Sequence, residues 1–124
     1  MIPIVLCPQC LQRVNMRLYD AAQFKGGWFV GNFLPSVIQT PLFEVCYKLH
    51  AAGEQWDTHY HKLAIEVNYL IEGSMKINEQ LLEAPIVFVL DPMEIATPEF
   101  LTDVKLIIVK MPSDTNDKYI VDDK

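Results

Sequence analysis

The sequence predicts an all-β fold, an antiparallel sandwich or barrel, and three observations support this prediction. Short stretches rich in β-branched and aromatic residues recur at fairly regular spacing, and no long stretch has a helical period. Most of the eight prolines fall between these stretches, where proline ends strands. The 124 residues are 51% apolar and 21% charged, which suits one globular domain with its own core.

The N-terminal part of the chain is the least regular. Residues 1–15 have no clear period, so we expect them to be an appendage to a single domain that spans residues 16–124. Met16 to Phe24 can hold one short helical turn, ended by the pair of glycines that follows it. Little or no other helix is expected. The aromatic and β-branched stretch from Trp28 to Phe33 is the first predicted strand.

The stretch from Leu42 to His50 alternates along its length and is predicted to be a strand that is buried on one side. One face carries Phe43, Val45, Tyr47 and Leu49, and the other face carries Glu44, Lys48 and His50. On this pattern we expect the aromatic Tyr47 to pack in the core or to line a pocket.

Four more strands are predicted towards the C-terminus. Leu63 to Ile71 and Met75 to Asn78 flank a tight turn at Glu72-Gly73-Ser74, and strand, glycine turn and strand together are typical of a hairpin. The apolar stretches from Ile86 to Leu90 and from Val104 to Val109 are the last two predicted strands.

Charge and hydropathy exclude several classes of protein. The net charge is −6 and no basic cluster offsets it, so we expect no nucleic-acid partner and no anionic membrane surface. No apolar run approaches the roughly 20 residues of a membrane helix, and the first residues lack the features of a signal peptide, so a cytoplasmic protein is expected. Acidic residues gather in the tail and are expected to be solvated: Asp114, Asp117, Asp122 and Asp123.

Three cysteines, an odd number, do not indicate a disulfide scaffold. Cys7 and Cys10 form a CPQC pair, but a four-ligand structural zinc site needs two further ligands and no second pair exists. We expect these two cysteines to be free thiols. Cys46 lies within a predicted strand and is expected to be a small core residue.

Ligand-type side chains are concentrated between residues 53 and 73. His59 and His61 are two positions apart, so in a strand both side chains project from the same face. Glu66 lies an odd number of residues beyond His61, and it can join the histidines only if a bulge or turn intervenes between Lys62 and Ile65.

Two histidines and one carboxylate form the ligand set of a facial triad, which leaves coordination positions open for substrate, water or dioxygen. These ligand types suit one divalent ion of iron, manganese, zinc or nickel. In the alternative interpretation, His59 and His61 lie on a polar surface loop and Glu66 is one more exposed carboxylate.

The spacing Gly53-x5-His59-x-His61-x4-Glu66-x6-Gly73 resembles the first motif of the cupin superfamily at every fixed position. The resemblance covers residues 28–111 and implies a double-stranded β-helix, or jelly-roll, barrel with a metal inside it when metal is present. The chain is further similar, in HYHK and KMPSDTNDKY, to small uncharacterised single-domain cupins.

The second cupin motif, G-x5-P-x-G-x2-H-x3-N, is mostly missing from this sequence. Aligned on Pro92, Thr97 stands where the resemblance places the histidine that is the fourth metal ligand. Three ligands can still hold a metal, or the site has lost its metal and become a ligand pocket. Glu94 replaces a motif glycine, and we expect it to be exposed.

The resemblance supports two functions. The first is a metal-dependent enzyme acting on a small polar molecule as an oxygenase, an isomerase or a sugar-modifying enzyme. The second is a non-catalytic module that binds a small ligand or has a regulatory role. The family also implies a homodimer that pairs through its sheets. The candidate ligand-contact residues are Tyr47, Asn68, Phe88 and Thr97, and His50 is a weaker candidate near the barrel mouth.

Overall fold

A computed structural model describes residues 16–121 of the chain. The expected appendage, the Cys7 and Cys10 pair and the last two acidic residues lie outside the described residues. The regular secondary structure of the described part is almost entirely β-strand, which confirms the predicted fold class. No helix in residues 16–121 is long and apolar enough to span a bilayer.

Two short 3-10 turns precede the strands, where one helical turn was predicted, and Asp20 caps the first of them. They are η1 (Ala21–Gln23) and η2 (Lys25–Gly27). The strands are β1 (Trp28–Gly31), β2 (Ile38–Gln39), β3 (Glu44–His50), β4 (His59–Tyr60), β5 (Ile65–Glu72), β6 (Ser74–Ile77), β7 (Gln80–Glu83), β8 (Ile86–Leu90), β9 (Pro98–Phe100), β10 (Val104–Met111) and β11 (Tyr119–Ile120).

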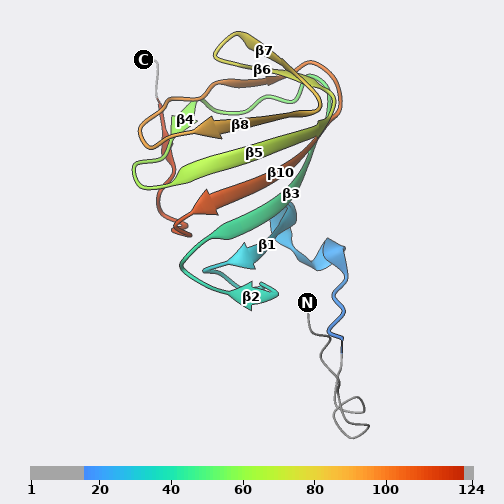
Figure 1. The fold of residues 1–124 in the computed structure, drawn as a ribbon, viewed down its shortest axis with the longest axis vertical. Helices are drawn as coiled ribbons and strands as arrows, with labels where there is room; N and C mark the ends of the chain where they lie inside the picture. Colours follow the sequence, from blue (N-terminus) through green and yellow to red (C-terminus); the bar gives the residue numbers. More distant parts are fainter. Residues whose placement is uncertain (1–15, 122–124) are drawn as a thin grey trace, which may run out of the picture.

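The strands form a large sheet and two small ones. The large sheet has the order β2-β1-β3-β10-β5-β8, and the small sheets have the orders β7-β6-β9 and β11-β4. Single β-bridges from Gln55 to Glu99 and from His59 to Ala96 connect the β4 segment to the β9 segment. Figure 1 shows the large sheet as a curved layer, with the strands of the small sheets behind its upper part.

The predicted hairpin at Gly73 is wrong, because the chain crosses from one sheet to another at this glycine. β5 pairs with β8 and β10, whereas β6 pairs with β7 and β9. Gly73 has φ +97°, and a Cβ on it would overlap the carbonyl oxygen of Asp103. The tight hairpin lies at Asn78-Glu79, where both residues have positive φ, as a type I′ turn requires.

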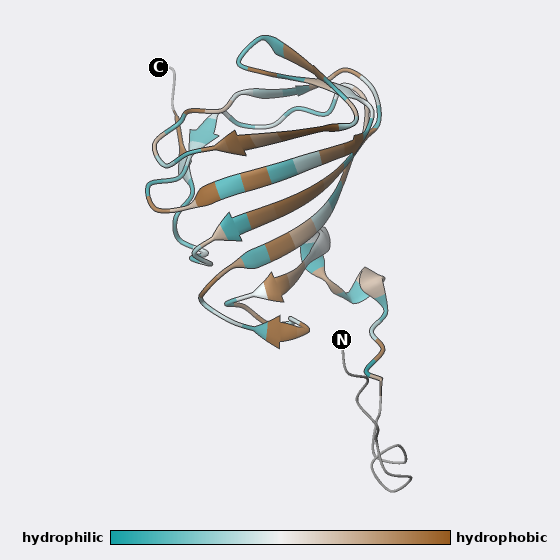
Figure 2. Cartoon of the chain, viewed as in Figure 1, coloured by the Kyte–Doolittle hydropathy of each residue, from teal (hydrophilic) through white to brown (hydrophobic). Residues whose placement is uncertain are grey.

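The orientation expected for β3 is also wrong. Glu44, Cys46 and His50 are buried, whereas Tyr47 is 43% exposed on the opposite face. The reason is that the inner side of the large sheet borders a cavity, and the polar alternate residues of β3 point towards it. Figure 2 shows the same alternation of hydrophilic and hydrophobic residues along β5.

The apolar core fills part of the space between the sheets. Cys46 is fully buried there, as predicted. The buried core residues are Cys46, Leu70, Met75, Leu82, Phe100, Val104, Leu106 and Ile108. This cluster joins the inner faces of β3, β5 and β10 to β6, β7 and β9, and it supports one side of the cavity described next.

Candidate metal centre and its cavity

The two histidines are carried by β4 and by the residue that follows it. The backbone of His59 exchanges two hydrogen bonds with Ala96, at 3.0 and 2.8 Å. On the other side of β4, Tyr60 pairs with Tyr119 of β11, and the two rings stack with centroids 5.3 Å apart. Pairing on both sides fixes the direction in which the histidine side chains project.

A bend follows His61, between β4 and β5, as the prediction for Glu66 required. One carboxylate holds this bend in place. The Asp117 oxygens accept hydrogen bonds from the backbone N–H groups of Lys62, Leu63 and Ala64 at 2.9–3.2 Å. Asp117 is buried, so the expectation that it is a solvated tail residue is wrong.

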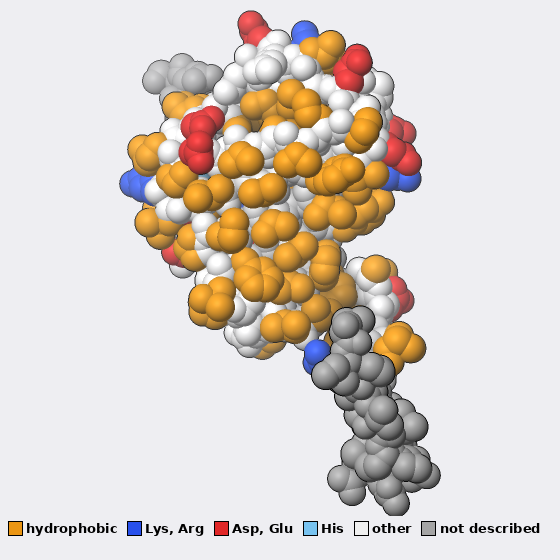
Figure 3. Space-filling model, viewed as in Figure 1, with side chains coloured by type: hydrophobic (Ala, Val, Ile, Leu, Met, Phe, Trp, Pro, Cys, Tyr) orange, Lys and Arg blue, Asp and Glu red, His pale blue; other side chains and the backbone are white. Residues whose placement is uncertain are grey.

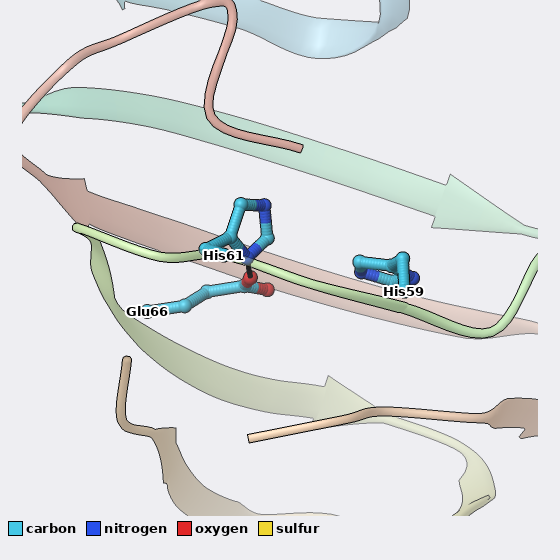
Figure 4. A group of neighbouring side chains, drawn as sticks. All are labelled: His59, His61 and Glu66. Atoms are coloured by element: carbon cyan, nitrogen blue, oxygen red, sulfur yellow. Dashed lines mark ion pairs between the residues drawn. The ribbon is translucent and has the colours of Figure 1, made fainter. Parts of the chain in front are cut away.

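The bend brings Glu66 onto the same side as the two histidines. Figure 4 shows His61 and Glu66 pointing towards each other and His59 beside them. His61 Nδ1 lies 3.6 Å from Glu66 Oε2, and one ligand atom from each of the three residues lies within 4.8 Å of the others. Neighbouring ligands of one ion lie about 3–3.5 Å apart when each is about 2.1 Å from the metal. Small side-chain rotations therefore suffice to enclose an ion.

The hydrogen bonds of the histidines favour metal binding. His59 Nδ1 donates to the carbonyl oxygen of Asp57 at 2.8 Å, which leaves the lone pair on Nε2. His61 is buried, and its Nε2 has no hydrogen-bond partner in the described part of the chain. Burial, followed by the nearby Lys110 ammonium, lowers the pKa of His61 to about 4, so the ring is neutral at pH 7.

A row of charged residues crosses the inner face of the large sheet beside the metal ligands. The strand register places Lys110 between Glu44 and Glu66. Lys110 Nζ lies 3.3 Å from Glu44 Oε1 and 4.8 Å from the centre of the Trp28 ring. The Lys110 ammonium is thus balanced by Glu44 and leaves the Glu66 carboxylate available to an ion.

The site opens into a cavity of about 450 Å³ between the sheets. His59, His61 and Glu66 all line it. Its aromatic walls are Trp28, Phe33, Trp56, Phe88 and Phe100. This volume, with apolar walls and a few polar groups, is typical of a site for a small molecule.

The candidate ligand-contact residues divide into two groups. Asn68 and Phe88 line the cavity, and Asn68 Nδ2 is buried with no hydrogen-bond partner among residues 16–121. Tyr47 lies on the outer face of the large sheet, away from the cavity. Thr97 is exposed and bonded to Thr58, and its neighbour Ala96 lines the cavity opposite His59. The inward position is therefore one residue earlier than the alignment on Pro92 implies.

His50 lines the cavity as a buried residue, whereas the sequence made it only a weaker candidate near the barrel mouth. It is buried, and it lines the cavity from the last position of β3. Its Nδ1 is bonded to Glu54, and its ring stacks on Phe100 with centroids 3.9 Å apart. Burial lowers its pKa, although the Glu54 carboxylate opposes this. The only sequence signal was its place on the face shared with Glu44. Glu94 is exposed, as expected.

Comparison with known proteins shows the fold and leaves the activity open. No protein-family model matches the sequence, and no curated protein matches it. An uncharacterised Klebsiella pneumoniae protein with a double-stranded β-helix domain is similar in structure, with a TM-score of 0.63 and 15% identity over 87% of this chain and 98% of that one.

Two further similar structures come from Ralstonia eutropha and Ruegeria pomeroyi. The first is a protein of unknown function with a cupin-like fold, with TM-score 0.56 and 14% identity over 76% of this chain and 60% of that one. The second is the DMSP lyase DddQ, with a TM-score of 0.60 and 10% identity over 76% of this chain and 49% of that one. The chain therefore has the cupin fold, a double-stranded β-helix.

Proposed function

We propose that this cupin-fold chain binds one divalent transition metal through His59, His61 and Glu66 and acts as an enzyme on a small molecule in the adjoining cavity. The observation that carries the proposal is the convergence of one ligand atom from each of His59, His61 and Glu66, all within 4.8 Å of one another. Iron, manganese, zinc and nickel all suit this ligand set. When bound, such a metal supplies Lewis-acid polarisation or oxygen activation.

The protein's own groups support a small-molecule reaction at this place. Ala96 faces His59 and has no ligand atom, so the three protein ligands leave positions open for a substrate oxygen. Asn68 offers a free amide donor inside the cavity. Oxygenase, isomerase and sugar-modifying reactions all fit these features. The similar structure of DddQ, a DMSP lyase, shows that enzymes occur on this fold.

Metal analysis of the protein purified without chelator tests the proposal. We expect close to one metal ion per chain in the wild type, and less than about a tenth of that in a His59→Ala/His61→Ala variant, because one carboxylate alone binds weakly. His50→Gln is the matched control, since His50 lines the same cavity without joining the ligand set. A wild type without metal, unchanged by the double substitution, would contradict the proposal.

A second function is a non-catalytic module that binds a small ligand without metal. The degenerate second motif favours it, because neither Ala96 nor Thr97 supplies the fourth ligand. In that case, metal-free wild-type protein and the His59→Ala/His61→Ala variant would bind the same ligands equally well. Calorimetric titration of both proteins with one ligand separates the two functions.

We also propose a homodimer that forms through the outer face of the large sheet. Figure 3 shows hydrophobic side chains gathered over this sheet, with few charged ones among them. Large apolar patches on a protein surface mark interaction sites.

A further inference from the structure

Positive charge is concentrated in the cavity of an otherwise acidic protein. The net charge of the chain is −6, and it has ten lysines and arginines in all. Four lysines line the cavity: Lys25, Lys48, Lys110 and Lys118. The acidic residues that line it are Glu44, Glu66 and Asp114.

Pairing removes part of this charge and leaves three ammonium groups, those of Lys25, Lys48 and Lys118. Lys110 is paired with Glu44. Within residues 16–121, neither Lys48 nor Lys118 forms an ion pair, and Lys48 Nζ donates only to the carbonyl oxygen of Gly26, at 2.9 Å. Three of the four lysines that line the cavity thus have no ion-paired carboxylate in the described part of the chain.

Two of these ammonium groups, on Lys48 and Lys118, lie against one aromatic ring. Lys118 Nζ lies 4.8 Å and Lys48 Nζ 5.3 Å from the centre of the Trp56 ring. Trp56 is itself fixed, because its Nε1 donates to Glu54 at 2.7 Å. Burial lowers the pKa of Lys118, and Lys110 and Lys48 lower it further, whereas the carboxylates of Asp57 and Glu66 oppose this shift. An anion bound between two like charges offsets their mutual repulsion.

We propose that the cavity takes an organic anion, a carboxylate with an apolar body, and that Lys48 and Lys118 bind its carboxylate over Trp56. Aromatic side chains on the cavity wall cover the apolar body, which an inorganic ion would leave uncovered. The unpartnered amide of Asn68 supplies a further donor in the same cavity. This inference deepens the proposed function by naming the substrate class, but the lysine site does not itself require the metal.

Benzoate and its neutral isostere benzamide test the inference by charge alone. The two indole N–H signals of Trp28 and Trp56 report binding in NMR titrations of the full chain. We expect benzoate to bind at least about tenfold more tightly than benzamide. Lys48→Gln and Lys118→Gln should each weaken benzoate binding roughly tenfold or more, because a charged hydrogen bond is lost. Lys105→Gln is the control, since Lys105 pairs with Glu72 on the surface.

The same titrations in excess chelator separate this inference from the proposed function. If the lysines hold the carboxylate, the preference for benzoate and the losses in the two variants persist without metal. If the metal alone holds it, the chelator abolishes benzoate binding and the inference is overturned. Equal affinities for benzoate and benzamide, no benzoate binding at 10 mM, or wild-type affinity in both folded lysine variants would overturn it as well. Retained indole shift dispersion shows that the variants are folded.

Discussion

Asp117 is the residue on which the geometry of the candidate metal centre depends most, although it touches none of the ligands in the triad. Its carboxylate holds three consecutive backbone N–H groups in the bend between His61 and Glu66. Without that bend, strict strand alternation would place Glu66 on the face opposite the histidines.

Removing this carboxylate is predicted to cost stability and metal affinity together. We expect Asp117→Ala to lower the free energy of unfolding by about 2–4 kcal/mol, because one buried and two partly buried N–H groups lose a charged acceptor. Metal affinity should fall at least about tenfold, because losing a group that orients metal-binding side chains typically has an effect of this size. Chemical denaturation and metal titration measure the two effects. Glu99→Gln, an exposed carboxylate, is the control.

The pH dependence of this contribution follows from the pKa of Asp117. Burial raises the pKa, but the backbone N–H groups of Lys62, Ala64 and Leu63 prevail and lower it from 3.8. A lowered carboxyl pKa stabilises the fold above pH 3.8, and this stabilisation is lost as the pH falls through the lowered value. Wild type and Asp117→Ala should therefore converge in stability only in strong acid, and convergence near pH 6 would contradict this account.

The three candidate ligands could be identified from the sequence, whereas the residues that support them could not. His59, His61 and Glu66 lie within eight positions, so their spacing is a local signal. Asp117 lies more than fifty positions further along the chain, and nothing in its acidic surroundings marks it as buried. His50 was underestimated for a similar reason, since its partner Phe100 comes from a distant strand.

At the scale of elements, β3 and the β5–β6 connection show where local patterns mislead. Apolar alternation indicates which residues share a face, and it was right about that for β3. It does not indicate which face is inner when polar side chains on the inner side line a cavity. A glycine between two strands likewise fits a hairpin or a crossing between sheets, and only strand pairing distinguishes them.

The two motif glycines are predicted to differ sharply in their tolerance of a side chain. Both have positive φ, +97° at Gly73 and +78° at Gly53. A Cβ at Gly73 would overlap the Asp103 carbonyl, whereas a Cβ at Gly53 meets nothing within 4 Å. We expect Gly73→Ala to cost at least about 3 kcal/mol and Gly53→Ala about 1 kcal/mol of unfolding free energy. Denaturant unfolding of both variants measures the difference. Equal losses of stability would contradict the close backbone approach at Gly73 as the cause of its lower tolerance.

At the scale of the molecule, the large sheet carries both core residues and a charged row on its inner side, and an exposed apolar row on its outer side. Its inner side carries the charged row through Lys110 and the cavity. Its outer side carries an apolar row across four neighbouring strands, and each member is between 39% and 54% exposed: Tyr47, Ile107, Tyr69 and Val87. This arrangement suits a sheet whose outer side is covered by a partner.

The apolar row predicts a dimer that substitutions at its centre dissociate. Ile107 and Tyr69 are cross-strand neighbours in the middle of the row. We expect sedimentation of the wild type to give twice the chain mass of 14.2 kDa, and Tyr69→Lys/Ile107→Lys to raise the dimer dissociation constant roughly a hundredfold or more, since central aromatic and apolar anchors dominate such interfaces. Leu81→Lys, an equally exposed apolar residue on β7, should leave the dimer intact. A monomeric wild type at micromolar concentration, or a double variant as dimeric as the wild type, would show that a second copy does not cover this face.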